Sequence, residues 1–370
     1  MNSGQRNLLR YNDKVYLHLT KNSMKKIFNR WVIVVAVLAA CTTMSFGQQD
    51  PMYSQYMFNM LSVNPAYAGS REMLTATALY RKQWVGIDGA PTTITFTADA
   101  PVRNQKMALG LNVVSDKIGI SKTMMINASY AYRIRLVNGG ILSLGLQGGI
   151  NQYRADYSPV KTSYPGLDPP MIDQAFASSE GSLFPNFGFG AYYYTGRFFV
   201  GMAVPKMLKN NLSGTNSPTL DFTSYPNRQN RHMFVTSGYS FDVNPDWSLK
   251  PSVLVKGVHG APLEMDINVN AWWREKVGAG LSYRTADAMV AMFQFQAKPE
   301  INFGYAYDMT LSKFSGSNSG SHELMVRFEP HAKKVLAKRA QINQRKSGYN
   351  KAKKKRKPAF KRNRRKIGRR

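Results

Sequence analysis

The chain has 370 residues and a formal charge of +29 at pH 7, from 50 Lys and Arg against 21 Asp and Glu. The charge is uneven, because residues 331–370 carry +19 and residues 1–47 carry +6, which leaves only +4 on residues 48–330. The basic character thus belongs to a tail, which excludes a basic folded nucleic-acid-binding domain. No linker rich in Pro, Gly or Ser divides the body, so we expect one large domain there.

Residues 24–47 have the pattern of a secretory signal peptide. A basic stretch (Lys25, Lys26 and Arg30) precedes an apolar run at 31–40, and small residues at 45–47 suit signal peptidase. The apolar run is about half the roughly twenty residues that a membrane-spanning helix needs. We therefore expect a removed signal and a mature chain that begins at Gln48.

Two features near the N-terminus leave alternatives open. Met24 itself opens a normal signal, so we interpret residues 1–23 as an upstream extension and Met24 as the true start. The run from Leu38 to Cys41 also resembles a lipoprotein cleavage site, which makes lipidation of Cys41 the alternative to cleavage after Gly47. Cys41 is the only cysteine, so cleavage after Gly47 excludes disulfides and thiolate metal sites in the mature chain.

Alternating polar and apolar residues dominate the body. For example, Leu142, Leu144 and Leu146 alternate with polar or small residues, which is the period of a strand with two unlike faces. No run approaches the length of a membrane-spanning helix. The pattern and its turn signals predict fourteen strands, at about 72–82, 91–101, 105–115, 122–137, 140–154, 184–195, 197–204, 231–243, 246–257, 263–273, 276–285, 287–298, 299–311 and 321–328.

The lengths of strands and connections favour an outer-membrane β-barrel. Many segments have the length of a tilted strand that crosses the hydrocarbon layer, and several carry aromatic residues at their ends. Tight connections such as 138–140 and 244–246 contrast with long ones at 155–183 and 205–230. The predicted fold is all-β, a transmembrane barrel of about fourteen antiparallel strands at 48–330 with a basic extension. A large soluble sandwich or propeller is the alternative, although no blade repeat occurs.

The stretch that follows the signal is dense in aromatic, amide and turn-forming residues. We single out Gln55, Tyr56, Asn59, Asn64, Pro65, Tyr67, Gly69, Arg81, Gln83 and Trp84. Pro65 and Gly69 suit a turn, because Pro fixes φ and Gly accepts a positive φ. Contact with a partner on the periplasmic side is the other interpretation of Tyr56, Asn59 and Tyr67. Arg81 and Trp84 follow a strand, where an interfacial Arg and a girdle Trp are expected.

Three charged residues on separate predicted strands are candidates for a network inside the barrel. They are Arg284, Asp308 and Glu323. Attraction between opposite charges would bring these side chains together in a polar lumen, where a pair avoids an uncompensated buried charge. Other chemistry has little support. The histidines lack metal-ligand spacing, no Gly-x-Ser-x-Gly elbow occurs, and the Gly-x-Gly pairs lack a third glycine. We predict no enzyme activity and no cofactor.

The opening residues resemble the PorP/SprF family of outer-membrane proteins of the type IX secretion system and its gliding machinery. The family pattern is present as Asp50-Pro51, Ser54 to Met57, Asn64 to Gly69, Tyr80 to Trp84 and Gly89 to Pro91. Weaker matches extend the resemblance over about 48–328. Two features depart from it: Lys206 stands where the family often has His, and a basic tail follows the last strand.

The resemblance implies a component that supports secretion or surface attachment of cargo proteins. It implies location in the outer membrane with periplasmic termini, and contacts with outer-membrane lipid, with other secretion or gliding proteins and with surface cargo. It does not identify the cargo. A passive porin-like channel for small solutes is the alternative function, because polar residues face the predicted lumen.

The tail, residues 331–370, is predicted to be a disordered periplasmic segment. Its density of charge prevents collapse without a partner. The densest groups are Lys353, Lys354, Lys355, Arg356 and Lys357, followed by Arg364 and Arg365. Because an exported chain does not meet cytosolic nucleic acid, we expect it to bind acidic periplasmic proteins, cell-wall polymer or anionic lipid.

Overall fold

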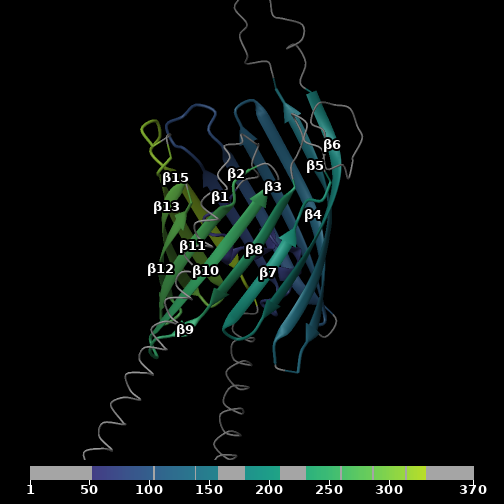
Figure 1. Cartoon of the computed structure of the whole chain (residues 1–370), viewed down its shortest axis with the longest axis vertical. Coiled ribbons are helices and arrows are strands. Elements are labelled where there is room, and N and C mark those ends of the chain that lie inside the picture. The colour runs from purple at the N-terminus through teal and green to yellow at the C-terminus, as the bar shows by residue number, and fades with distance from the viewer. Residues whose placement is uncertain are drawn as a thin grey trace, which may run out of the picture. The chain divides into compact units, whose positions relative to one another are not determined.

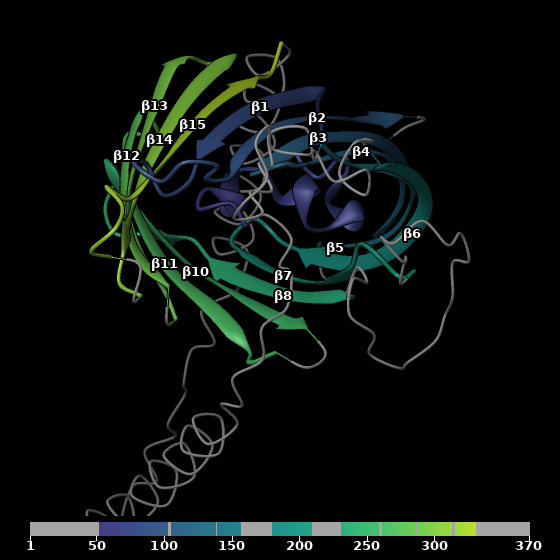
Figure 2. The ribbon, with the colours of Figure 1, turned by 90° about the horizontal axis from the view of Figure 1, so that it is seen from above.

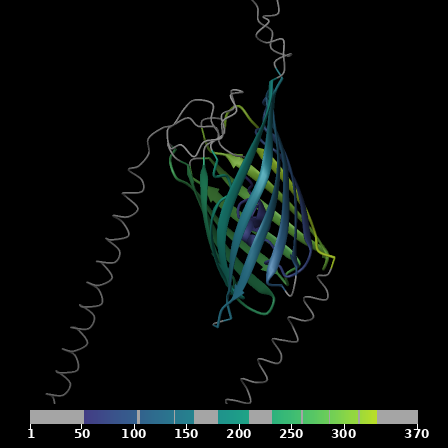
Figure 3. The same cartoon turned by 90° about the vertical axis from the view of Figure 1, so that its right-hand side faces the viewer.

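The structure is a computed structural model that describes residues 52–102, 105–137, 139–156, 180–208, 231–258, 261–285, 287–312 and 315–330. The predictions for the signal peptide, for Cys41 and for the basic tail fall on residues outside these ranges. The strands form a single antiparallel sheet that closes on itself, because β1 (Thr75–Lys82) pairs with β15 (Ser321–Phe328). Figures 1 and 3 show the resulting barrel with its tilted strands.

Between β1 and β15, each strand pairs with the strands beside it in sequence, except that β8 and β9 both pair with β10 and not with each other. These strands are β2 (Thr92–Val102), β3 (Met107–Ile118), β4 (Ser121–Arg135), β5 (Ile141–Ala155), β6 (Glu180–Tyr194), β7 (Phe198–Val204), β8 (His232–Tyr239), β9 (Phe241–Asp242), β10 (Trp247–Val258), β11 (Glu264–Trp273), β12 (Val277–Arg284), β13 (Ala288–Lys298) and β14 (Ile301–Thr310).

β8 and β9 share one position in the wall. Both pair with β10, and they are separated only at Ser240, whose N–H donates to the carbonyl oxygen of Arg197. The barrel therefore has fourteen strand positions, which confirms the predicted number. The largest difference from the predicted ranges is in β6, which begins four residues earlier than the pattern indicated.

The two faces of the wall are inverted relative to a water-soluble protein. On β5, Ser143 and Gln147 point inward and are buried, whereas Leu144 and Leu146 point outward and are 49% and 66% exposed. The same alternation recurs around the barrel, and aromatic residues such as Trp247, Trp273 and Phe328 end strands on the outer face. This arrangement rules out a soluble sandwich, which would bury the apolar face. Among the described residues, no helix has the length and apolar character needed to span a membrane.

The two ends of the barrel differ in their connections. One end, which we call the short-turn end, carries the connections 103–106, 136–140, 195–197, 243–246, 274–276 and 299–300. The four longest connections lie at the opposite, long-loop end: 83–91, 156–179, 205–231 and 311–320. In barrels of the bacterial outer membrane short turns face the periplasm and long loops face the cell surface. β1 therefore begins, and β15 ends, on the periplasmic side.

The chain before β1 fills the barrel. Residues 53–69, which we call the plug, include three short 3₁₀ turns, η1 (Tyr56–Phe58), η2 (Met60–Ser62) and η3 (Pro65–Tyr67). Figure 2 shows these turns inside the ring of strands. Plug residues including Gln55, Tyr56 and Ala66 are fully or almost fully buried. The lumen is thus closed by the protein's own N-terminal segment.

Local chemistry explains the end of the plug. Asn64 begins η3 as its N-cap, because its side-chain oxygen accepts the N–H of Ala66 at 2.9 Å, and Pro65 has the φ that the first helical residue needs. Gly69 has a φ of +71°, and a Cβ there would lie 2.5 Å from the Cβ of Ala108. The structure therefore agrees with the interpretation of Pro65 and Gly69 as turn residues.

We expect the purified protein to resist SDS at room temperature and to change its gel mobility on boiling. A closed sheet has no edge from which strands can separate singly, so unfolding has a high kinetic barrier. The measurement compares boiled and unboiled samples on one gel. Equal mobility, together with extraction from membranes by salt alone, would contradict the membrane-spanning barrel.

Candidate functional site

A cluster of buried charges lies inside the barrel toward its long-loop end. It consists of Arg81, Asp266, Arg284, Asp308 and Glu323, from five different strands. Arg81 pairs with Asp308 at 2.7 Å and with Glu323 at 3.0 Å, and Arg284 pairs with Asp266 at 3.0 Å and with Asp308 at 3.6 Å. We call this group the lumenal charge cluster.

The plug completes this cluster. The backbone N–H groups of Ser54 and Gln55 donate to the two oxygens of Glu323, each at 2.9 Å. The hydroxyl of Ser54 donates to Asp308 and accepts from Arg81 at 2.7 Å. Two successive N–H groups and a guanidinium thus give the Glu323 carboxylate hydrogen bonds in place of those that burial removes. The plug is thus part of the network that neutralises the charges of the wall.

Three predicted members of this network, Arg284, Asp308 and Glu323, lie together, although Glu323 joins the others through Arg81 and Ser54 and not by a direct ion pair. The expectation of an interfacial position for Arg81 was wrong, because its side chain points into the lumen and is 2% exposed. The inward position of Arg81 could have been predicted from the sequence. Thr75, Thr77 and Leu79 share the inward phase of β1, and a strict period of two places Arg81 on the same face.

On the other side, the plug fits against glycines of the wall. A Cβ on Gly145 of β5 would lie 2.3 Å from the backbone nitrogen of Ala66, and one on Gly190 of β6 would lie 2.2 Å from Asn64 Oδ1. Asn64 also donates to the carbonyl oxygen of Ala191 at 3.1 Å. Because any side chain would occupy the place of the plug backbone, these glycines create the space in which the plug lies.

Other predicted residues of the opening stretch also contact the wall. Asn268 donates to the Tyr56 hydroxyl at 2.6 Å, Thr97 donates to Asn59 Oδ1 at 2.8 Å, and Gln294 donates to Gln55 Oε1 at 2.6 Å. The position of this segment differs from the expected one. Contacts of Ser54 with the charge cluster place it near the long-loop end, so the segment is not confined to the periplasmic side. Buried side chains such as Tyr56 and Asn59 contact no outside partner while the plug is in place.

Gln83 and Trp84 lie outside the lumen. They follow β1 at the long-loop end, where the N–H of Gln83 donates to the carbonyl oxygen of Pro91 at 2.9 Å. The N–H of Trp84 donates to the Ser321 hydroxyl at 3.1 Å, and Trp84 has a positive φ of 44°. Their backbone contacts hold the β1–β2 loop against the start of β15.

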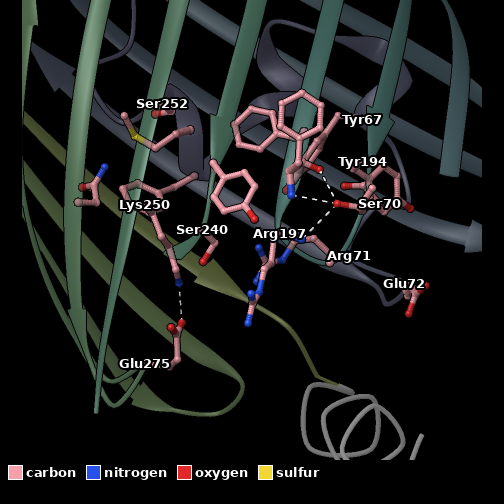
Figure 4. A pocket seen from close by; sticks show the side chains of 18 of the residues that line it. Tyr67, Ser70, Arg71, Glu72, Tyr194, Arg197, Ser240, Lys250, Ser252 and Glu275 are labelled. Atoms are coloured by element: carbon pink, nitrogen blue, oxygen red, sulfur yellow. Dashed lines mark hydrogen bonds and ion pairs between the residues drawn. The ribbon is translucent and has the colours of Figure 1, made fainter. Parts of the chain in front are cut away.

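At the short-turn end the plug forms the floor of a cavity of about 860 Å³, which we call the vestibule. One wall carries Tyr192, Tyr194 and Phe199 beside Tyr67 of the plug, with ring centroids 5.4–5.9 Å apart. On β10 and β11, Lys250 lies over the ring of Trp272. Figure 4 shows Arg71, Arg197 and Lys250 at this cavity, with Glu275 beside Lys250. The vestibule combines aromatic surface with charged groups.

An ion pair at the rim of the vestibule joins the residues just after the plug to the end of the last strand. Arg71 pairs with Glu329, and Arg327 lies 3.6 Å from the same carboxylate. Burial alone would raise the pKa of Glu329, but the two guanidinium groups outweigh burial and lower its pKa below the ordinary value. Glu329 therefore remains charged at neutral pH and ties the segment before β1 to the segment after β15.

The residues that the structure describes contain no group of three or more His, Cys, Asp or Glu side chains that could hold a metal ion. The buried carboxylates of the charge cluster are engaged by guanidinium and N–H groups. What this site does, on its geometry, is hold a polypeptide segment within a polar lumen.

A closed barrel with an apolar outer face and a plugged polar lumen defines an outer-membrane β-barrel protein. The family described as type IX secretion system membrane protein PorP/SprF matches residues 45–328. The chain belongs to this family, which confirms the resemblance seen in the opening residues and places the protein in the outer membrane. No curated protein matches the chain significantly.

Solved structures with some similarity are also barrels. The Acinetobacter baumannii outer membrane protein Omp33 is 8% identical with a TM-score of 0.41, over 70% of this chain and 97% of that one. A Pseudomonas aeruginosa FadL homologue is 14% identical with a TM-score of 0.39, over 76% and 95%. The Ralstonia pickettii toluene transporter TbuX is 9% identical with a TM-score of 0.43, over 76% and 95%. At these values no property of those proteins transfers to this one.

We expect Gly145→Val to displace the plug, because its side chain would overlap the backbone of Ala66. Overpacking of this kind costs about 1–3 kcal/mol. The readout is the free energy of unfolding in denaturant, together with proteolysis of the plug. Gly148→Val is the matched control, since a Cβ at Gly148 of the same strand meets nothing within 4 Å. Equal stability of the two variants would contradict close packing of plug and wall.

We expect Arg81→Met to destabilise the barrel by about 3–5 kcal/mol, because it leaves Asp308 and Glu323 with less compensation for their buried charges. The control is Arg197→Met, which breaks an exposed pair with Asp242 and should cost about 0–1 kcal/mol. Denaturant titration of the refolded proteins in lipid vesicles measures both values. A similar loss in the two variants would show that burial of the cluster has no special weight.

Proposed function

We propose that this protein is a non-enzymatic component of the type IX secretion system that supports secretion or surface attachment of cargo proteins by holding partners at its two mouths. Membership of the PorP/SprF family supports a role in this system. The observation that carries the rest is the buried plug, anchored to the wall from Ser54 at one end to Gly69 at the other. A barrel so filled is suited to binding proteins and not to conducting them.

The size of the barrel supports the same view. Fourteen strands enclose less space than the 16–18 strands of porins, which leave a water channel, and here the plug occupies that space. A folded cargo protein has no route through this lumen. The barrel would then act as an anchor or adaptor beside a separate conduit for cargo. A passive channel, by contrast, would conduct solutes through its own lumen.

The passive channel stays as the alternative function because the lumen is lined with polar groups such as Asn268 and Gln294. These groups also suit a wall that binds a polar plug, and Gln294 and Asn268 both donate hydrogen bonds to it. A solute pathway requires that the plug leave the lumen, which would expose the lumenal charge cluster without its Ser54 and Gln55 partners.

The basic tail adds a periplasmic connection to this proposal. It follows Glu329, at the end of the barrel that faces the periplasm, and its charge of +19 suits acidic periplasmic components of the machinery or cell-wall polymer. Contacts with outer-membrane lipid involve the apolar outer face of the strands. These partner assignments are part of the proposal.

The test deletes the gene for this protein in its native cell and measures the display of type IX cargo proteins on the cell surface. We expect one or a few cargo proteins to disappear from the cell surface, and to return when the intact gene is supplied. Cross-linking in cells, followed by identification of the captured proteins, names the partners. Normal display of all type IX cargo in the absence of the protein would overturn the proposed role.

Planar bilayers separate the proposal from the channel alternative. We expect little or no steady conductance from the intact protein, because the plug fills the lumen, and intermittent conductance from Gly145→Val, which disturbs the plug. Gly148→Val serves as the control and should behave like the intact protein. A robust open pore in the intact protein would favour the channel.

A further inference from the structure

The vestibule lies at the short-turn end of the barrel, which faces the periplasm. Its floor includes Met57, Phe58 and Tyr67, so an occupant would touch the plug directly. Its other lining residues come from strands and turns on several sides of the barrel. A molecule that binds here is therefore in contact with both the wall and the plug, which makes the vestibule a candidate for partner binding.

The lining indicates what kind of side chain would enter. Tyr194 and Phe199, partly buried, offer aromatic surface on β6 and β7, and Tyr192 and Trp272 lie deeper, 6% and 5% exposed. The indole Nε1–H of Trp272 is buried and has no hydrogen-bond acceptor among the residues that the structure describes. Because indole nitrogen is a donor only, a suitable occupant supplies both apolar bulk and an acceptor oxygen.

The charges at the vestibule are loosely held. Arg197 pairs with Asp242 at 2.5 Å, but the two side chains are 61% and 60% exposed. Lys250 pairs with Glu275 at 2.6 Å, and Glu275 is also largely exposed. Exposed pairs contribute little to stability, so a carboxylate from a partner can replace one of these acids at small cost.

The rim around the vestibule carries a surplus of basic groups. Exposed lysines and arginines occur at most of the short turns, namely Lys106, Arg135, Arg197, Arg274, Lys276 and Lys298. Fewer exposed acids lie among them, namely Asp242, Asp246 and Glu275, which pair with Arg197, Arg274 and Lys250. This surplus disfavours the protein's own tail as the occupant, because its charge of +19 would be repelled. The rim is complementary to a partner of the opposite charge.

We propose that the vestibule binds an acidic protein segment that places one bulky apolar side chain against the aromatic rings of the vestibule and its carboxylates on Arg197, Lys250 and the basic rim. The inference deepens the proposed function and rests on it, since the segment belongs to a periplasmic component of the same machinery. Binding there would connect that component to the floor of the plug.

The test measures binding of labelled synthetic peptides to the full-length protein in nanodiscs by fluorescence anisotropy. The first peptide has a central Trp flanked by glutamates, the second has Ser in place of Trp, and the third has Trp flanked by lysines. We expect the first to bind at least about tenfold more tightly than the other two. Equal affinity of the Trp and Ser peptides would overturn the proposal, because it would mean attraction by charge alone.

Charge reversal separates the vestibule from the tail. We expect Arg197→Glu combined with Lys250→Glu to weaken binding of the first peptide at least about tenfold. The matched control, Lys117→Glu combined with Lys122→Glu, changes two exposed lysines at the long-loop end and should leave the affinity unchanged. If the two double variants bind equally well, the tail is the binding element and the vestibule inference is wrong.

The outcome is separable from that of the proposed function. The peptide measurement uses purified protein and needs no cargo, whereas the proposed function is tested by display of cargo on cells. Specific peptide binding without any cargo defect would retain the vestibule and reject the secretion role. A cargo defect without specific peptide binding would retain the role and reject the vestibule.

Discussion

Charges inside the lumen must be compensated, and this requirement governs much of the structure. Arg81 and Arg284 are buried on the inner wall with Asp266, Asp308 and Glu323, where removal from water costs several kcal/mol per ion unless partners replace the lost hydration. The wall supplies most of those partners across five strands, and the N–H groups of the plug supply the remainder at Glu323. Closure of the barrel, position of the plug and charge compensation are therefore one arrangement.

The wall is predictable from sequence because its determinants are local. A strand that separates lipid from a polar lumen alternates residue by residue, so fourteen strands can be located from period two and turn signals alone. The same phase places Arg81 and Glu323 on the inner face. The pattern does not show which strand pairs with the free edge of β15. Because an even number of strands brings the start of β1 and the end of β15 to the same end of the barrel, antiparallel pairing of these two strands is the simplest closure.

The plug was not predictable in the same way. Residues 53–69 have no strand period, and their burial depends on contacts with partners far along the chain, such as Ser54 with Glu323. The role of the glycines that create space for the plug could not be predicted from the sequence either. Gly145 and Gly190 read as weak positions in a strand, and only their closeness to Ala66 and Asn64 explains why a side chain is absent there.

The position of the plug also explains why conspicuous residues and accessible residues differ in this protein. The opening stretch, rich in aromatic and amide residues, identifies the family. Most of its side chains, however, fill the lumen or compensate its charges, where no partner contacts them. Surfaces available to partners are therefore formed elsewhere, by turns, by loops and by the part of the plug that forms the floor of the vestibule. At the periplasmic mouth these include aromatic rings on β6, β7 and β11 and basic groups contributed singly by separate turns, so no single short motif in the sequence contains them. The plug thus gives the barrel a solid interior and leaves recognition to its two ends.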